Sequence, residues 1–160
     1  MDSLVNLYLQ RAENERDLAK ALLDVSQNDN LKLTLDLTQG ITFYSAVTSH
    51  SYYCIFYCAK ALLLTKNIKT DFPEIHKKTL DESKKHFVDT GILDVELLKI
   101  YNSMIIRADE LLELFKAEKQ KRGKFTYQKL PQANLEPAKE SVEHAFKFFK
   151  NISKIVTSIH

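Results

Sequence analysis

The stretch FYSAVTSHSYYCIFYCAKALLLTK, Phe43 to Lys66, decides the fold of this chain. Between Ile41 and Thr65 its only charged side chain is Lys60, and Tyr, Phe and Leu dominate its second half. A helix that is apolar on nearly every side must be surrounded by other elements, because none of its sides is suited to water. The stretch therefore predicts the central helix of an all-helical domain.

The composition supports one helical domain that covers residues 1–160. The chain is 44% apolar and 28% charged, with three Gly and three Pro among its 160 residues. So few chain breakers favour long helices over many short strands. The formal net charge of +2 is too small to indicate a nucleic-acid-binding protein by itself, although a near-neutral total can hide a basic face.

The two cysteines, Cys54 and Cys58, lie four residues apart within the apolar stretch. On one helix face they cannot readily form a disulfide, and two thiols without further ligands make a poor zinc site. We interpret them as small core residues and expect no metal and no cofactor. Reduced thiols and the lack of a signal peptide favour the cytoplasm. The segment Tyr52 to Leu64 is too short to span a bilayer and contains Lys60, so we expect no membrane helix.

Hydrophobic periodicity predicts five helices in an up-and-down antiparallel bundle. Their approximate ranges are 3–26, 42–66, 71–90, 94–120 and 135–159. The linker over 28–40 carries alternating leucines, but the sequence offers no convincing second strand to pair with it. We therefore expect this linker to be extended or to form a short helix.

The start of the third helix has a local signal of its own. Asp71, Pro73 and Glu74 have the spacing of a capping box, in which Asp71 would be the cap and Pro73 would lie in the first turn. Gly91 would end the same helix. This pattern predicts that the helix begins directly after Asp71.

The order of several motifs resembles the HEPN domain, whose name stands for higher eukaryotes and prokaryotes nucleotide-binding. The motifs are SYY-x-IFY-x-AKALLL at 51–64, a short loop followed by His76, HFVDTGILD at 86–94, and an Arg in the next helix. The resemblance runs from about Phe43 to Ile152. The sequence RGKFTYQ at 122–128 is similar to the longer stand-alone bacterial and archaeal members.

The resemblance implies a bundle of four to five helices that commonly forms a homodimer. Family members often act beside a separately encoded minimal nucleotidyltransferase in toxin–antitoxin-like pairs. Many are metal-independent endoribonucleases, in which an Arg is followed four to six residues later by a His and two such motifs meet across a dimer groove. The Arg would hold phosphate charge, and the His would move a proton at the ribose 2′-hydroxyl.

This chain departs from that motif. Arg107 is followed by ADELLELF and Arg122 by GKFTYQK, and neither segment contains a His. Tyr127 stands at the fifth position after Arg122, but a phenol with an unperturbed pKa of about 10 is a poor proton shuttle at neutral pH. We therefore favour a homodimeric module that binds nucleotide or RNA or docks a nucleotidyltransferase. The alternative is an endoribonuclease toxin with a variant site.

The variant catalytic site would use His76, Arg107 or Arg122, and Tyr127. His76 could act as an acid or base if it faces a groove, whereas a lone His on an apolar face is more often a core residue. Arg107 could anchor a phosphate at the edge of the bundle, or it could pair with an acidic residue of a neighbouring helix.

The candidate nucleotide- or RNA-binding residues are Lys60, Arg107, Arg122, Lys124 and Tyr127. The basic and aromatic loop that carries the last three could hold a phosphate and stack on a base, or it could be a solvated end of the preceding helix. Lys60 is more simply explained as a side chain that reaches solvent at the bundle end. The aromatic half of the central stretch, Tyr52 to Tyr57, is expected in the core, with part of it lining a dimer groove opposite the helix over 94–120.

Overall fold

The structure is a computed structural model that describes residues 2–120 and 134–159, with side chains for all of these except 113–120. The described residues contain helices and no strand, which confirms the all-α class. The helices in chain order are α1 (Ser3–Gln27), α2 (Asp29–Thr34), α3 (Tyr44–Leu64), α4 (Ile75–Ser83) with its π-helical continuation η1 (Lys84–Val88), α5 (Val95–Gln120) and α6 (Leu135–Ile159). The short helix α2 lies in the 28–40 linker, so the helical form of that linker is the correct one.

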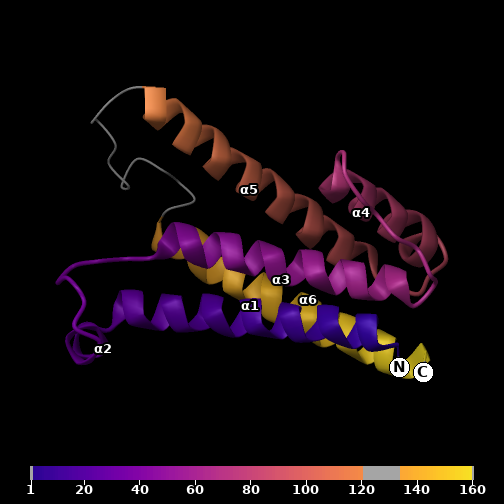
Figure 1. Cartoon of the computed structure of the whole chain (residues 1–160), viewed down its shortest axis with the longest axis horizontal. Coiled ribbons are helices and arrows are strands. Elements are labelled where there is room, and N and C mark those ends of the chain that lie inside the picture. Colours follow the sequence, from indigo (N-terminus) through magenta and orange to yellow (C-terminus); the bar gives the residue numbers. More distant parts are fainter. Residues whose placement is uncertain (1, 121–133, 160) are drawn as a thin grey trace.

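The long helices form an up-and-down bundle around α3, in which α6 runs in the same direction as α3, and α1 and α5 run in the opposite direction (Figure 1). Helices α1, α3 and α6 lie side by side, α5 runs obliquely beside α3, and α4 packs near the start of α5 (Figure 1). Helix α3 contacts α1, α4, α5 and α6. The two ends of the chain lie close together at one end of the bundle (Figure 1). The prediction of a central apolar helix is thus confirmed.

Burial on all sides explains why α3 is so apolar. Fourteen of its 21 residues are buried, including every residue from Cys58 to Leu64. Cys54 and Cys58 are free thiols with no exposed surface. Burial, and then the neighbouring Cys54, raise the pKa of the Cys58 thiol well above its usual value. Both cysteines are therefore core residues, as the sequence predicts.

Lys60 does not reach solvent, so that expectation is wrong. Its side chain is buried, and Nζ donates to the Thr70 carbonyl oxygen at 2.5 Å and to Thr70 Oγ1 at 3.2 Å. Thr70 Oγ1 also bonds to Thr79 Oγ1 of α4 at 2.7 Å. Burial lowers the pKa of Lys60, and the charge of Asp71 partly opposes that shift. Lys60 therefore ties the loop after α3 to α4.

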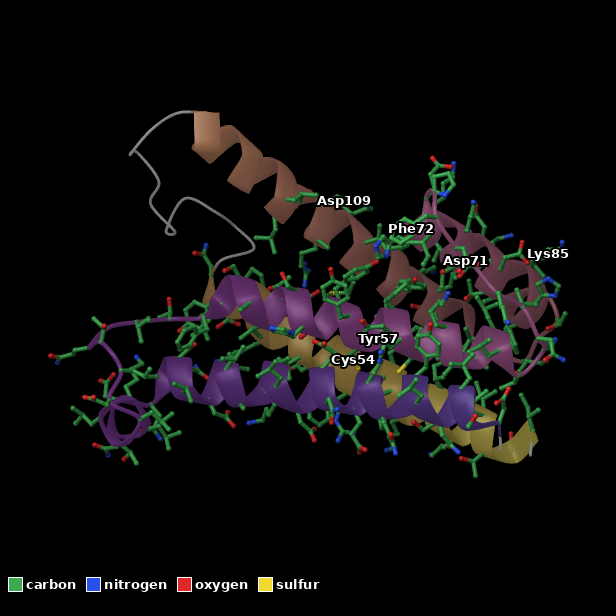
Figure 2. All side chains as sticks on the ribbon, viewed as in Figure 1. Cys54, Tyr57, Asp71, Phe72, Lys85 and Asp109 are labelled. Atoms are coloured by element: carbon green, nitrogen blue, oxygen red, sulfur yellow. The ribbon has the colours of Figure 1, made fainter. Side chains whose placement is uncertain are left out.

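The third helix begins later than its capping signal indicates. Helix α4 starts at Ile75, and the residue before it, Glu74, has a left-handed backbone with φ of 57°. A left-handed residue interrupts a right-handed helical path, so Asp71 cannot be the cap. The Phe72–Pro73 peptide is cis, and Phe72, in the loop before α4, is 84% exposed (Figure 2).

Other predicted helix ends are correct. Gly91 follows η1 with a positive φ of 76°, which a glycine adopts without steric cost. Asp94 caps α5, because its Oδ1 accepts a hydrogen bond from the Glu96 N–H at 2.8 Å. Asn134 precedes α6, and its carbonyl oxygen accepts from the Ala138 N–H. Within the described ranges, no helix combines the length and the apolarity that crossing a bilayer requires.

Candidate functional site

A pocket of about 270 Å³ opens between α3, α4 and α5. We call it the aromatic pocket. Its lining residues are Ser49, Tyr52 and Tyr53 of α3, His76 of α4, and Ala108, Asp109, Leu111 and Leu112 of α5. The apolar side chains form most of its wall, and three hydroxyls, an imidazole and a carboxylate supply its polar groups. This combination suits a small, planar, partly polar ligand.

A hydrogen bond between Tyr52 and His76 organises one wall of the aromatic pocket. The Tyr52 hydroxyl bonds to Nδ1 of His76. Burial raises the pKa of Tyr52, and the charges of Tyr53 and Asp109 add to the effect, so the phenol keeps its proton and can donate it. We therefore assign the Nε2–H tautomer to His76.

His76 is neutral at physiological pH. Burial lowers the pKa of its imidazole, and the Asp109 carboxylate partly opposes the shift. Its ring centroid lies 4.7 Å from that of Phe56 and 5.4 Å from that of Tyr52. These contacts leave Nε2 as the ring nitrogen that could donate to a ligand.

The pocket also offers an exposed aromatic face and an acceptor. Tyr53 is 41% exposed, and its ring centroid lies 5.5 Å from that of Tyr52. Asp109 is an exposed residue of α5 (Figure 2), and its carboxylate can accept hydrogen bonds from N–H groups. A planar ring with amino or imino donors could stack on Tyr53 and bond to Asp109. A phosphate would be repelled by Asp109 and would have to point out of the pocket.

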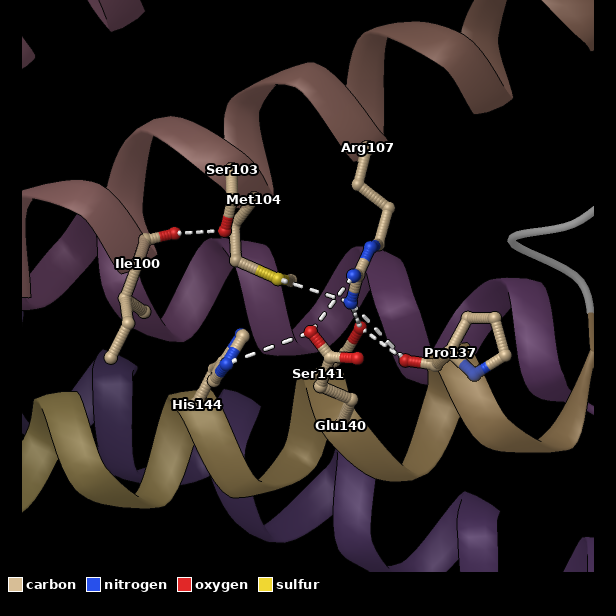
Figure 3. A network of polar contacts seen from close by, with 8 residues as sticks. All are labelled: Ile100, Ser103, Met104, Arg107, Pro137, Glu140, Ser141 and His144. Carbon is tan, nitrogen blue, oxygen red and sulfur yellow. Dashed lines mark hydrogen bonds and ion pairs between the residues drawn. The ribbon is translucent and has the colours of Figure 1, made fainter.

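A second polar cluster joins α5 to α6 (Figure 3). Arg107 Nη1 donates to Ser141 Oγ at 2.9 Å and to the Pro137 carbonyl oxygen at 3.4 Å, while Nη2 donates to Glu140 Oε1 at 3.1 Å. Arg107 therefore pairs with an acidic residue of a neighbouring helix, which is one of the two alternatives that the sequence leaves open. We call Arg107, Glu140, Ser141 and His144 the arginine cluster.

His144 completes the arginine cluster. Its Nε2 lies 3.7 Å from Oε1 of Glu140, the same oxygen that Arg107 contacts (Figure 3). Burial is the main cause that lowers the pKa of His144; Arg107 and Lys147 lower it further, and Glu140 and Glu143 oppose them. Its Nδ1 is buried and has no hydrogen-bond partner among the described residues. The cluster thus holds an Arg and a neutral His at one carboxylate.

The structure separates residues that the sequence groups together. Arg107 lies in the arginine cluster and His76 in the aromatic pocket, on different faces of α5, because residues 107 and 109 of one helix point in different directions. Lys60 belongs to neither. Arg122, Lys124 and Tyr127 lie outside the described residues.

Sequence reasoning missed three residues of these sites: Asp109, Glu140 and His144. Glu140 and His144 stand four residues apart on a predicted helix, so their contact along one face could have been read from the sequence. The sequence could not reveal that Arg107 and His144 meet at Glu140, because they lie 37 positions apart and come together only through the packing of two helices. The residues that the structure describes contain no group of three His, Cys, Asp or Glu side chains arranged to hold a metal ion.

The chain is similar to two proteins of Methanocaldococcus jannaschii whose names describe them as toxins. It is 37% identical over 92 residues to "Putative toxin MJ0142", which covers 58% of this chain and 56% of that protein. It is 31% identical over 96 residues to "Putative toxin MJ0605", which covers 60% of this chain and 65% of that protein. The chain thus spans less than two thirds of the length of these curated relatives. No family model and no solved structure matches it.

Proposed function

We propose that this chain is a HEPN-type module that binds a nucleotide or RNA, acts as a homodimer, and pairs with a minimal nucleotidyltransferase in a toxin–antitoxin-like system. The observation that carries the binding function is the aromatic pocket, with an exposed ring next to a carboxylate and a neutral His. The motif order at residues 43–152 supports the family. The similarity to two proteins named as toxins supports the biological setting.

The pocket fits the base of a nucleotide better than its phosphate. Its volume of about 270 Å³ is just below the roughly 300–1,000 Å³ of sites that enclose drug-sized ligands, so it has room for one base. Stacking on Tyr53 would bury the face of the base. The Asp109 carboxylate and His76 Nε2–H would bond to its edge. The phosphate would then lie outside the pocket, away from the Asp109 carboxylate.

Exposed apolar side chains on α5 support the homodimer. Ile106 is 51% and Leu112 53% exposed, although other faces of α5 are buried. A second copy of the chain would remove this surface from water. Light scattering after size exclusion should give twice the monomer mass, and Leu112→Asp should give the monomer mass. A monomeric parent protein would contradict the dimer and leave the pocket unaffected.

Nucleotide binding is tested with adenosine triphosphate and a short single-stranded RNA at low salt, where phosphate contacts are strongest. Tyr53→Ala should weaken binding by about 1–3 kcal/mol, which is roughly fivefold to a hundredfold, because it removes the stacking face. Phe72→Ala is the matched control, since Phe72 is an exposed aromatic residue outside the pocket. Titration calorimetry measures both. Failure of the parent protein to bind either ligand, or equal loss in both variants, would contradict the assigned site.

The second candidate function, a metal-independent endoribonuclease, is favoured by the contact of Arg107 and His144 at Glu140. A substrate phosphate could replace the Glu140 carboxylate at the guanidinium. His144 Nε2 could then take the proton of the ribose 2′-hydroxyl. The 2′-oxygen would attack the adjacent phosphorus, and the 5′-oxygen of the next nucleotide would leave and take up a proton.

Purified protein incubated with RNA distinguishes this candidate. Arg107→Lys and His144→Gln should each slow cleavage by about a hundredfold or more, the usual contribution of a positioned acid or base, whereas His76→Gln should retain most of it. Circular dichroism melting checks that each variant is folded. Equal cleavage by the parent protein and all variants would mean that a contaminant is responsible.

A further inference from the structure

A shallow groove of about 750 Å³ runs along the outer side of α6 where α1 packs against it. We call it the α6 groove. Its lining residues are Arg16 of α1 and Phe146, Lys147, Phe149, Lys150, Asn151, Ser153 and Lys154 of α6. None of these residues lines the aromatic pocket or belongs to the arginine cluster. The α6 groove is therefore a separate surface, and its composition is basic and aromatic.

The α6 groove carries three unneutralised positive charges. Lys147, Lys150 and Lys154 are exposed, and none lies within 4.0 Å of a carboxylate among the described residues, whereas Lys20 and Lys99 are both paired with acidic neighbours. The sequence contains no Asp or Glu from residue 144 to residue 160. The helix dipole does not explain why lysines lie here. Its favourable effect on positive charge is confined to the last turn of a helix, and the last turn of α6 contains no basic residue.

The aromatic side of the groove is held in place by α1. The guanidinium carbon of Arg16 lies 5.0 Å from the ring centroid of Phe146 and 4.5 Å from that of Phe149. Glu13 and Asp17 pair with Arg16 at 3.2 and 2.8 Å, so they fix its position and more than offset its charge. Phe146 remains 40% exposed. The groove thus combines an oriented, exposed ring with three free cations.

We infer that the α6 groove binds single-stranded RNA, with its lysines on the phosphates and Phe146 under a base. Lys147 and Lys154 are seven residues apart, or ~10 Å along the helix, and Lys150 lies between them on the same face, so three flexible ammonium groups follow one line. Basic charge beside an exposed ring is the usual combination for binding single strands without sequence preference. This inference rests on the proposed function in taking RNA as its ligand, but it uses a different surface.

Two other occupants fit the α6 groove less well. A second copy of the chain in a symmetric dimer would place the same lysines opposite one another, and like charges in contact are costly. An acidic polypeptide would satisfy the lysines, but its carboxylate side chains offer no flat ring to stack on Phe146. Single-stranded RNA satisfies both kinds of group.

The test compares two triple variants that lose the same charge at different places. Lys147→Gln/Lys150→Gln/Lys154→Gln alters the groove, and Lys69→Gln/Lys77→Gln/Lys85→Gln, three exposed lysines elsewhere, is the matched control. Fluorescence anisotropy with a short labelled RNA measures affinity from about 50 to 200 mM salt. The groove variant should bind about a hundredfold more weakly near 0.1 M salt, and the slope of log affinity against log salt should fall by about 2, as expected for three lost phosphate contacts. The control should match the parent protein.

Two additions identify the ligand class. Phe146→Leu should weaken RNA binding roughly fivefold or more through lost stacking. Polyglutamate should compete poorly with RNA, and competition equal to that of unlabelled RNA would instead assign the groove to an acidic protein. Equal RNA affinity of the two triple variants would overturn RNA binding by the α6 groove while leaving the proposed function intact. If the parent protein binds no RNA even at low salt, yet still binds adenosine triphosphate in the aromatic pocket, RNA binding by the α6 groove alone is overturned. If it binds neither ligand, both the groove and the proposed binding function are overturned.

Discussion

A neutral histidine lies on each of two sides of helix α5, His76 of α4 and His144 of α6, and the surroundings of the two differ. In the aromatic pocket, His76 is bonded to the Tyr52 phenol and lies against the Phe56 ring. In the arginine cluster, His144 lies at a carboxylate that already binds a guanidinium. Burial lowers the pKa of both imidazoles. The chemistry offered to a ligand therefore differs, although the protonation state does not.

The difference shows which cluster also stabilises the bundle. The arginine cluster spans α5 and α6, which otherwise make few contacts, and it does so with charge-assisted hydrogen bonds. The aromatic pocket is closed by neutral groups, with Asp109 at its edge. A ligand could enter the pocket without breaking an ion pair, whereas a ligand of Arg107 would have to displace Glu140. Substitutions on the two sides should therefore have different costs.

Substitution of Arg107 in the arginine cluster should have the largest effect on stability. Arg107→Ala removes the hydrogen bonds to Ser141 and Glu140, and bonds that involve a charged group contribute about 2 kcal/mol when partly shielded from water. The Arg107 side chain is only 17% exposed, so solvent screening does not remove the effect. Urea unfolding should show a decrease of about 2 kcal/mol in the free energy of unfolding.

Lys99→Ala on the same helix is the control for that prediction. Its side chain is 67% exposed and pairs only with Glu96, so its loss should change stability by about 0.5 kcal/mol or less. If Arg107→Ala were no more costly than Lys99→Ala, the arginine cluster would not hold α5 to α6, and the contrast between the two sides of α5 would disappear.

Loss of the Tyr52–His76 hydrogen bond in the aromatic pocket should lower the free energy of unfolding by less. Tyr52→Phe removes one hydroxyl and leaves Nδ1 of His76 without its donor, which should cost about 1 kcal/mol, the usual net value of a neutral hydrogen bond. Tyr53→Phe is the control, because Tyr53 is 41% exposed and its ring would remain. The same urea experiment measures both. A cost for Tyr52→Phe equal to that of Arg107→Ala would mean that charge does not distinguish the two clusters.

Most of the fold could be predicted from the sequence because its signals are local. The apolar stretch that became α3 and the Gly91 terminator depend on a few neighbouring residues. The start of α4 could not be predicted in this way, because a good capping box at Asp71 is overridden by the left-handed backbone of Glu74. Lys60 was misjudged for a related reason, since its partner Thr70 belongs to a loop whose path the sequence does not specify.

The sites were predicted less well because they depend on packing between helices. Tyr52 and Tyr53 line a pocket together with residues of α5, whereas the dimer groove that the sequence predicts at this place stays a prediction. The Arg107–Glu140–His144 contact joins two amphipathic helices at one register among several that their patterns allow. The hydrophobic periodicity of one sequence predicts which face of a helix is buried, but it does not predict how far the helix is shifted along its neighbour.

The pH dependence of stability should give the smallest signal and should distinguish the two histidines. Because the folded pKa of His76 and of His144 lies below the unfolded value of about 6.5, the unfolded chain binds more protons as the pH falls through 6.5. Their contribution is therefore complete above that value and decreases as the pH falls toward each folded pKa. His76→Gln/His144→Gln should flatten this part of the stability curve, measured by urea unfolding between about pH 5 and 8. Glu140→Gln should steepen it through His144 alone, because Glu140 raises the pKa of that imidazole, and an unchanged curve in Glu140→Gln would mean that His144 and Glu140 are not coupled.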